Sequence, residues 1–166
     1  MNYLYNSKTW IEYLENHFDE CNDYFKFAMV WMSFNSYYAS RYNRTKGELN
    51  QIIKFAKDNK SLYSSLNDNG FSNILMEFKN TGWLFNEPGD RNCVADMRIG
   101  SNKKMYFKEH NQSCKDFFKV VYQIRCNLFH GSKEVSDDGN KKLIKWAYKY
   151  LNIFWKEFLN RSNNET

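Results

Sequence analysis

Arg125 and His130, separated by four residues, are the side chains whose types and spacing suggest chemistry. A histidine suits proton transfer because its unperturbed pKa, ~6.5, lies near neutral pH. An arginine suits a phosphate because its planar fork can donate two hydrogen bonds to phosphate oxygens. If both side chains reach one phosphate, they supply it with positive charge and a proton-transfer group.

The stretch that must position this pair is residues 117–131, which the apolar spacing predicts to be a helix. Ser113 and Asp116 form a capping box just upstream of it. Gly131 stands where a left-handed residue would end the helix, so His130 is expected in the last turn or at the cap. Side chains at helical spacing form the expected buried face: Phe117, Val121, Ile124 and Leu128.

A helical projection at about 100° per residue separates Arg125 from the other polar candidates. A second apolar row widens the buried arc and consists of Phe118, Tyr122 and Phe129. Arg125 falls inside this second row, whereas Asn127 and His130 fall outside the buried arc. Arg125 and His130 are about 140° apart, a gap that the long arginine side chain can span across the end of the helix.

Around these residues the chain resembles the HEPN family (higher eukaryotes and prokaryotes nucleotide-binding domains), small all-helical proteins that include many RNases. The family hallmark is an Arg, four to six residues, and a His near the end of a late helix, here Arg125-Cys-Asn-Leu-Phe-His130. An early helical row of aromatic residues and an asparagine is also similar to the family: Trp31, Phe34, Asn35 and Tyr38. Core packing alone would produce the same aromatic row.

The resemblance implies a metal-independent endoribonuclease, a toxin or antiviral defence effector, that cleaves RNA by attack of the ribose 2′-OH. Such cleavage needs a base, an acid and positive charge near the phosphorane. Arg125 and His130 supply half of this set, and HEPN RNases generally dimerise so that two motifs share a cleft. The resemblance makes Asn127 the supporting polar residue, although Cys126 takes the place after the Arg that is often polar in the family. Expected partners are therefore an RNA substrate, a second copy of the chain forming a homodimer, and an antitoxin or regulatory protein.

Two other interpretations of the same residues stay open. Arg125 could pair with an acidic residue of a neighbouring helix, and His130 could cap its own helix, where a cation gains about 0.3–1 kcal/mol. A non-catalytic HEPN module would instead bind RNA or a partner protein through the same surface. Single changes at either residue distinguish an enzyme from a binding module, because only the enzyme loses cleavage.

Composition predicts one helical domain over residues 1–166. Aromatic residues make up 19% of the chain and proline occurs once, at Pro88, which favours a folded, mainly helical protein over disorder. The net charge of +5 is compatible with a polyanionic partner but is not diagnostic of one. We therefore expect an all-α fold, an antiparallel bundle of four to five main helices like that of HEPN proteins.

The cysteines predict no metal site. They form no CxxC pair and no metal-ligand spacing with a histidine, and they stand at Cys21, Cys93, Cys114 and Cys126. We therefore expect no cofactor and a reducing, cytoplasmic location. No stretch has the length of a transmembrane helix, and the first residues lack the apolar core of a signal peptide.

Helical spacing predicts the remaining helices at about 9–18, 22–41, 45–56 and 71–79, with a last one that follows a turn at 136–140 and ends near 159. Thr9 with Glu12 and Thr45 with Glu48 are the candidate capping boxes among them. Between 82 and 111 the periodicity fades and basic residues are scattered: Arg91, Arg98, Lys103, Lys104 and Lys108. This segment is expected to be either a loop that approaches RNA phosphates or a solvated connection.

Overall fold

The computed structural model describes residues 3–17, 22–67, 70–81, 93–97, 101–109, 112–129 and 138–164. Within these ranges the chain forms seven helices: α1 (Tyr3–Asn16), α2 (Asp23–Arg41), α3 (Glu48–Asp58), α4 (Lys60–Asn67), α5 (Ile74–Asn80), α6 (Cys114–Phe129) and α7 (Asp138–Asn164). Two short strands, β1 (Cys93–Ala95) and β2 (Lys104–Tyr106), pair as an antiparallel hairpin. The predicted all-α class is therefore confirmed, with one small sheet that the sequence analysis did not predict.

The helix predictions were most accurate where packing and capping agree. Asn22 caps α2 through its side chain, which accepts a hydrogen bond from the Phe25 backbone N–H, as the predicted start near residue 22 requires. The predicted start of the first helix at Thr9 was wrong, because α1 begins at Tyr3 and Thr9 lies inside it. Ser7 explains the earlier start, since it is fully buried against α2 and its carbonyl accepts a hydrogen bond from the Ser33 hydroxyl.

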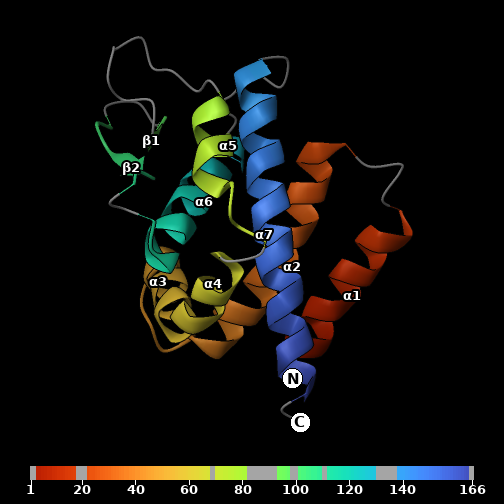
Figure 1. Ribbon diagram of the computed structural model, residues 1–166. Coiled ribbons are helices and arrows are strands. Elements are labelled where there is room, and N and C mark those ends of the chain that lie inside the picture. The colour runs from red at the N-terminus through yellow and green to blue at the C-terminus, as the bar shows by residue number, and fades with distance from the viewer. Residues whose placement is uncertain are drawn as a thin grey trace.

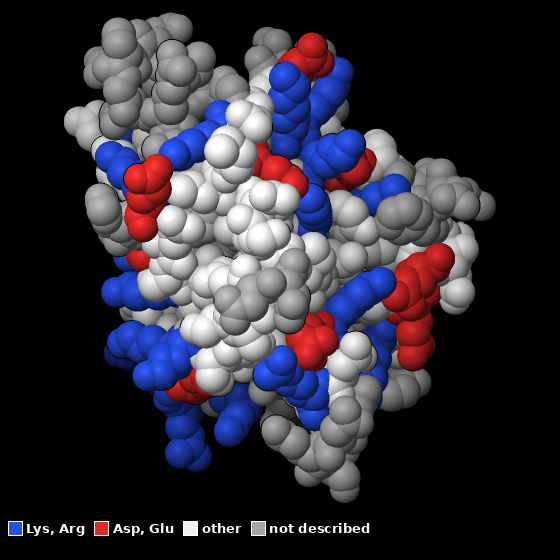
Figure 2. All heavy atoms as spheres, in the orientation of Figure 1, with Lys and Arg blue, Asp and Glu red and all other residues white. Residues whose placement is uncertain are grey.

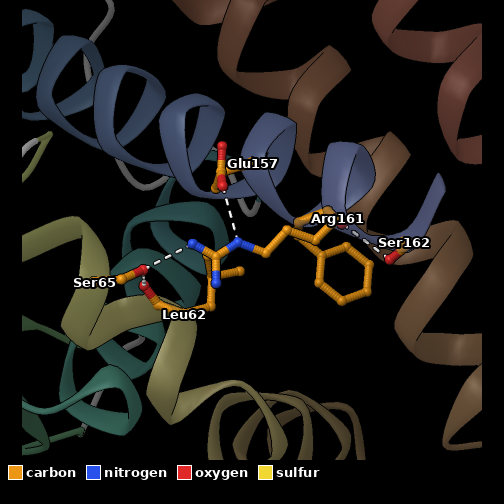
Figure 3. A network of polar contacts seen from close by, with 6 residues as sticks. Leu62, Ser65, Glu157, Arg161 and Ser162 are labelled. Atoms are coloured by element: carbon orange, nitrogen blue, oxygen red, sulfur yellow. Dashed lines mark hydrogen bonds and ion pairs between the residues drawn. The ribbon is translucent and has the colours of Figure 1, made fainter. Parts of the chain in front are cut away.

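The polar stretch 58–70, for which the sequence predicted no element, contains α4. Its Leu62, Tyr63 and Leu66 are buried, so this short helix is stabilised by packing rather than by a strong local signal. Arg161 of α7 also contacts α4, because its guanidinium donates hydrogen bonds to Ser65 and to Glu157 (Figure 3). The C-terminal part of α7 is thus fixed against α4 by both apolar and polar contacts.

The core is a cluster of aromatic side chains to which α2, α3, α6 and α7 each contribute. The Phe34 ring of α2 lies 5.2 Å from Phe118 of α6 and 5.4 Å from Trp155 of α7, centroid to centroid. Phe55 of α3 lies 5.4 Å from Phe118 and 6.0 Å from Phe154. All five side chains are fully buried. Pairs at these separations are the offset and edge-on arrangements that aromatic rings favour, so α2, α3 and α7 are held at fixed positions around α6.

Figure 1 shows how the remaining elements surround this core. The long α7 runs the length of the molecule, α1 packs on one side of α2, and the β1–β2 hairpin lies on the opposite side, near α6. The α3 and α4 helices lie at the lower end of the view, away from the hairpin. The hairpin and the α3–α4 pair are therefore separate regions of the surface.

A buried polar contact joins α2 to α7, and its removal gives a test of this packing. Trp155 Nε1 donates to Ser33 Oγ at 2.6 Å, so Ser33→Ala leaves a buried indole N–H without an acceptor. We expect a loss of about 1–3 kcal/mol in the free energy of unfolding, measured by urea denaturation. Ser36→Ala is the control, because Ser36 donates to the Ser33 carbonyl in its own helix and should cost less. Equal midpoints for Ser33→Ala and the wild type would contradict the packing.

Candidate functional site

The α6 helix begins and packs as its sequence predicts. Ser113 Oγ accepts a hydrogen bond from the Asp116 backbone N–H at 3.2 Å, which confirms Ser113 as the N-cap, and it donates to Asp116 Oδ2 at 2.5 Å. Phe117, Val121 and Ile124 of the predicted buried face have no exposed surface. Local sequence therefore suffices to place the start of α6 and its main apolar face.

Two residues near the end of α6 differ in burial from the prediction. Asn127, expected outside the buried arc, is only 2% exposed, whereas Phe129, expected within it, is 52% exposed. The β1–β2 hairpin explains the first difference, because it covers the side of α6 that carries Asn127. Phe129 lies in the last turn of α6, where no described element covers its ring completely.

Asn127 fixes the hairpin to α6. Its Oδ1 accepts hydrogen bonds from the Met97 backbone N–H at 3.2 Å and from Gln123 Nε2 at 3.0 Å. Its Nδ2 donates to the Ala95 carbonyl at 2.8 Å. The side chain is therefore committed to backbone and side-chain partners within the protein. This placement makes Asn127 a residue that positions other elements.

Arg125 lies on another side of α6 and forms an ion pair with α3. Its Nη1 is 3.2 Å from Glu48 Oε2, with one quarter of the arginine side chain and 30% of the glutamate side chain exposed. The other carboxylate oxygen, Oε1, accepts a hydrogen bond from the Tyr38 hydroxyl of α2 at 2.7 Å. Glu48 thus connects α2, α3 and α6 through one carboxylate, and the ion pair that the sequence left open as an alternative is present.

This use of Glu48 also explains why the capping box predicted for the third helix was wrong. The helix is preceded by Gly47 at φ +86°, not capped by Thr45, and no side chain caps it. The Glu48 carboxylate points to Arg125 and Tyr38 and therefore does not return to its own helix start. Glycine suits this position because it adopts a positive φ without steric cost.

Aromatic rings border the Arg125 guanidinium on two sides. Its Cζ lies 5.6 Å from the centroid of Trp31 and 5.5 Å from that of Phe129, within the range of cation–π contacts. The Arg125 Nε and the Trp31 Nε1 are both buried without a hydrogen-bond acceptor. Buried donors are usually paired, so these two N–H groups are unusual, but neither is open to solvent. The part of Arg125 that a ligand oxygen can reach is the exposed quarter of its side chain.

The phenols beside Arg125 are donors at neutral pH. Burial, a hydrogen bond with Cys126 and the charge of Glu48 raise the pKa of Tyr122 to about 12, although Arg125 lowers it. Burial and the hydrogen bond to Glu48 raise the pKa of Tyr38 well above its usual value. Both hydroxyls stay protonated near pH 7. They can therefore donate hydrogen bonds in this cluster but cannot act as bases.

His130, the predicted proton-transfer residue, lies outside the described residues, and it directly follows Phe129 in the sequence. The structure therefore brings Arg125 together with Glu48, Tyr38 and Trp31, and it places Asn127 apart from them at the hairpin. The sequence analysis missed the role of Glu48 because its partner is 77 positions away in the chain. Within the described ranges, no three His, Cys, Asp or Glu side chains are arranged to hold a metal ion.

Comparisons of the chain with protein-family models, with curated proteins and with solved structures find no match. In the part of the chain that the structure describes, no helix combines the length and the apolar character needed to cross a membrane.

The contribution of the Arg125–Glu48 ion pair to stability can be measured by removing the Glu48 carboxylate. Glu48→Ala removes the acceptor of both Arg125 and Tyr38, so the free energy of unfolding should fall by about 1.5–3 kcal/mol. Glu77→Ala is the matched control, because Glu77 likewise pairs with a cation, Lys149, and with the Tyr150 hydroxyl, but on a more exposed surface, so its loss should cost less. Urea denaturation measures both variants, and a smaller loss for Glu48→Ala than for Glu77→Ala would contradict a structural role of the Arg125 contact.

Proposed function

We propose that this protein is a metal-independent endoribonuclease of the HEPN type, acting through a composite site in which a homodimer brings two Arg-x4-His motifs together. The observation that supports this proposal is the state of Arg125. Glu48 accepts only from its Nη1, and one quarter of the arginine side chain is exposed, so part of the guanidinium fork is available to a phosphate. In the sequence, His130 follows this anchored cation by five positions.

In the proposed reaction, the two copies of His130 divide the proton transfers. One imidazole takes the proton of a ribose 2′-OH, and the 2′-oxygen attacks the adjacent phosphorus. The bond from phosphorus to the 5′-oxygen then breaks, and the second, protonated imidazole gives its proton to that oxygen. The products are a 2′,3′-cyclic phosphate and a 5′-hydroxyl. Arg125 would stabilise the additional negative charge of the phosphorane.

Glu48 and Tyr38 would act as positioning residues in this reaction. The Glu48 carboxylate holds one end of the guanidinium, and the Tyr38 hydroxyl holds that carboxylate from α2. The Trp31 ring restricts the guanidinium from another side. A charge whose orientation is fixed before the reaction stabilises a transition state more effectively than one that must reorganise. Asn127 would hold the hairpin against the end of α6.

The alternative, a non-catalytic HEPN module that binds RNA or a partner protein, is favoured by the same ion pair. Glu48 offsets part of the positive charge of Arg125, as an arginine with a structural role would require. Under this alternative the protein has no cleavage activity to lose, and changes at Arg125 would only weaken binding of RNA or a partner protein or lower stability. As a toxin or antiviral defence effector in the cytoplasm, the enzyme would instead inhibit growth until an antitoxin or regulatory protein restrains it.

Incubation of the purified protein with total RNA in EDTA tests the proposal. We expect the wild type to leave 2′,3′-cyclic phosphate ends, and both His130→Ala and Arg125→Lys to lower the cleavage rate at least about 100-fold while the dimer persists. His17→Ala is the matched control, because His17 stacks on Tyr13 in α1 and contacts the Tyr13 carbonyl.

Light scattering monitors the dimer, and thermal unfolding monitors the fold of each variant. Cleavage that survives His130→Ala would contradict the assigned chemistry. A folded wild-type dimer that cleaves no RNA would favour the binding module.

A further inference from the structure

The β1–β2 hairpin forms a second polar surface that is distinct from the Arg125 cluster. The strands pair in the register Cys93 with Tyr106 and Ala95 with Lys104. Asn127 bonds both to the Ala95 carbonyl and to the Met97 backbone N–H, so the hairpin is fixed to the last turns of α6. A three-residue strand pair would be marginal alone, and this anchor gives it a defined position.

A pocket of about 660 Å³ opens at this hairpin, within the roughly 300–1,000 Å³ range of sites that hold small molecules or parts of larger ligands. Residues 95–97 and Tyr106 line one part of it, and residues 101–104 line another. Tyr106 is partly exposed and presents an aromatic ring to the pocket. The site therefore combines a concave surface with a ring on which a flat group can stack.

Basic side chains lie around the same ring. Lys108 Nζ is 4.2 Å from the Tyr106 ring centroid, and Lys103 is exposed at the pocket rim. Lys104 lies on the same face of β2 as Tyr106, because alternate residues of a strand share a face. Figure 2 shows basic side chains beside the hairpin region and a second group over α3 and α4. Aromatic stacking next to lysines is the arrangement that binds single-stranded nucleic acids.

A buried carboxylate determines which part of a nucleotide the pocket would accept. Asp96 is only 4% exposed, lines the pocket, and accepts a hydrogen bond from the Ser101 hydroxyl at 2.9 Å. A base amine or a ribose hydroxyl could donate to it, while phosphates approach Lys103 and Lys108 outside.

We propose that the hairpin binds single-stranded RNA, with a base stacked on Tyr106 and phosphates beside Lys103 and Lys108. The inference extends the proposed function, because the bound strand would be the one whose scissile phosphate reaches Arg125. Asn127 follows Arg125 by two residues, about 3 Å along the helix axis but about 200° around it. A strand that contacts both surfaces would therefore have to pass around α6, and the hairpin would select unpaired RNA.

Binding can be tested without cleavage. The probe is a fluorescein-labelled oligonucleotide of roughly 12 nucleotides with 2′-O-methyl groups, because a blocked 2′-oxygen cannot attack. Fluorescence anisotropy in EDTA gives Kd at several salt concentrations. We expect Tyr106→Leu to raise Kd about tenfold and Tyr106→Phe, which keeps the ring, to leave it within about twofold. Lys103→Gln should lower the slope of log Kd against log salt by about 0.7.

Lys60→Gln is the matched control, because Lys60 is exposed at the start of α4, at the other end of the molecule from the hairpin (Figure 1). It should leave both Kd and the salt slope unchanged. A wild type that does not bind, an unchanged slope for Lys103→Gln, or a larger loss for Lys60→Gln than for the hairpin variants would overturn the inference. Lys103→Gln keeps the test decisive if Tyr106→Leu unfolds the hairpin.

The two proposals fail separately. Wild-type binding that the hairpin variants lose, combined with no cleavage of total RNA, supports the hairpin site and overturns the nuclease. Cleavage by the wild type with normal binding by every hairpin variant overturns the hairpin site alone.

Discussion

The half-buried ion pair between Arg125 and Glu48 is the constraint on which the candidate site depends. A guanidinium that is three-quarters withdrawn from water needs a partner charge, since its desolvation is costly. That partner is the first residue of α3, and it is in reach only because the Phe55 and Phe118 rings hold α3 against α6. The position of one cation is therefore a consequence of the aromatic core.

Three sides of α6 make different contacts. One side packs against the aromatic residues of α2, α3 and α7, another directs Arg125 toward Glu48, and a third binds the hairpin through Asn127. Because all three belong to one rigid helix, the spacing between the cation and the hairpin is fixed by helical geometry. Such an arrangement would let one element position a phosphate and the strand that carries it.

Local sequence predicted most of the helices but not the contacts that define the site. The Ser113 N-cap and most of the buried row of α6 are short-range features and are confirmed, whereas Leu128 of that row is only partly buried. The burial of Asn127 was missed because it depends on two three-residue strands, which are too short to give a periodic signal. The pairing of Glu48 with Arg125 joins residues 77 positions apart, and nothing in either local pattern indicates it.

The roles assigned to Arg125, Asn127 and His130 in RNA cleavage stay predictions, and the structure bears on them unequally. Arg125 has a defined environment in which one quarter of its side chain is exposed, and Asn127 has partners that give it a positioning task. The resemblance to HEPN proteins is strongest around residues 113–131, of which the structure describes 113–129, and it also includes the aromatic row of α2. The fold supports the helical class that this resemblance implies and leaves the family assignment as a proposal.

Nuclear magnetic resonance of the arginine side chains tests most directly whether Arg125 binds a phosphate. The ¹⁵N-labelled protein is titrated with an uncleavable 2′-O-methyl RNA while the Nε–H resonances of Arg125 and Arg161 are followed. Arg161 is an internal reference, because its Nε already donates to Glu157. The account predicts a large shift for Arg125 and little change for Arg161. An unchanged Arg125 resonance at saturating RNA would contradict it and leave Arg125 as a structural residue.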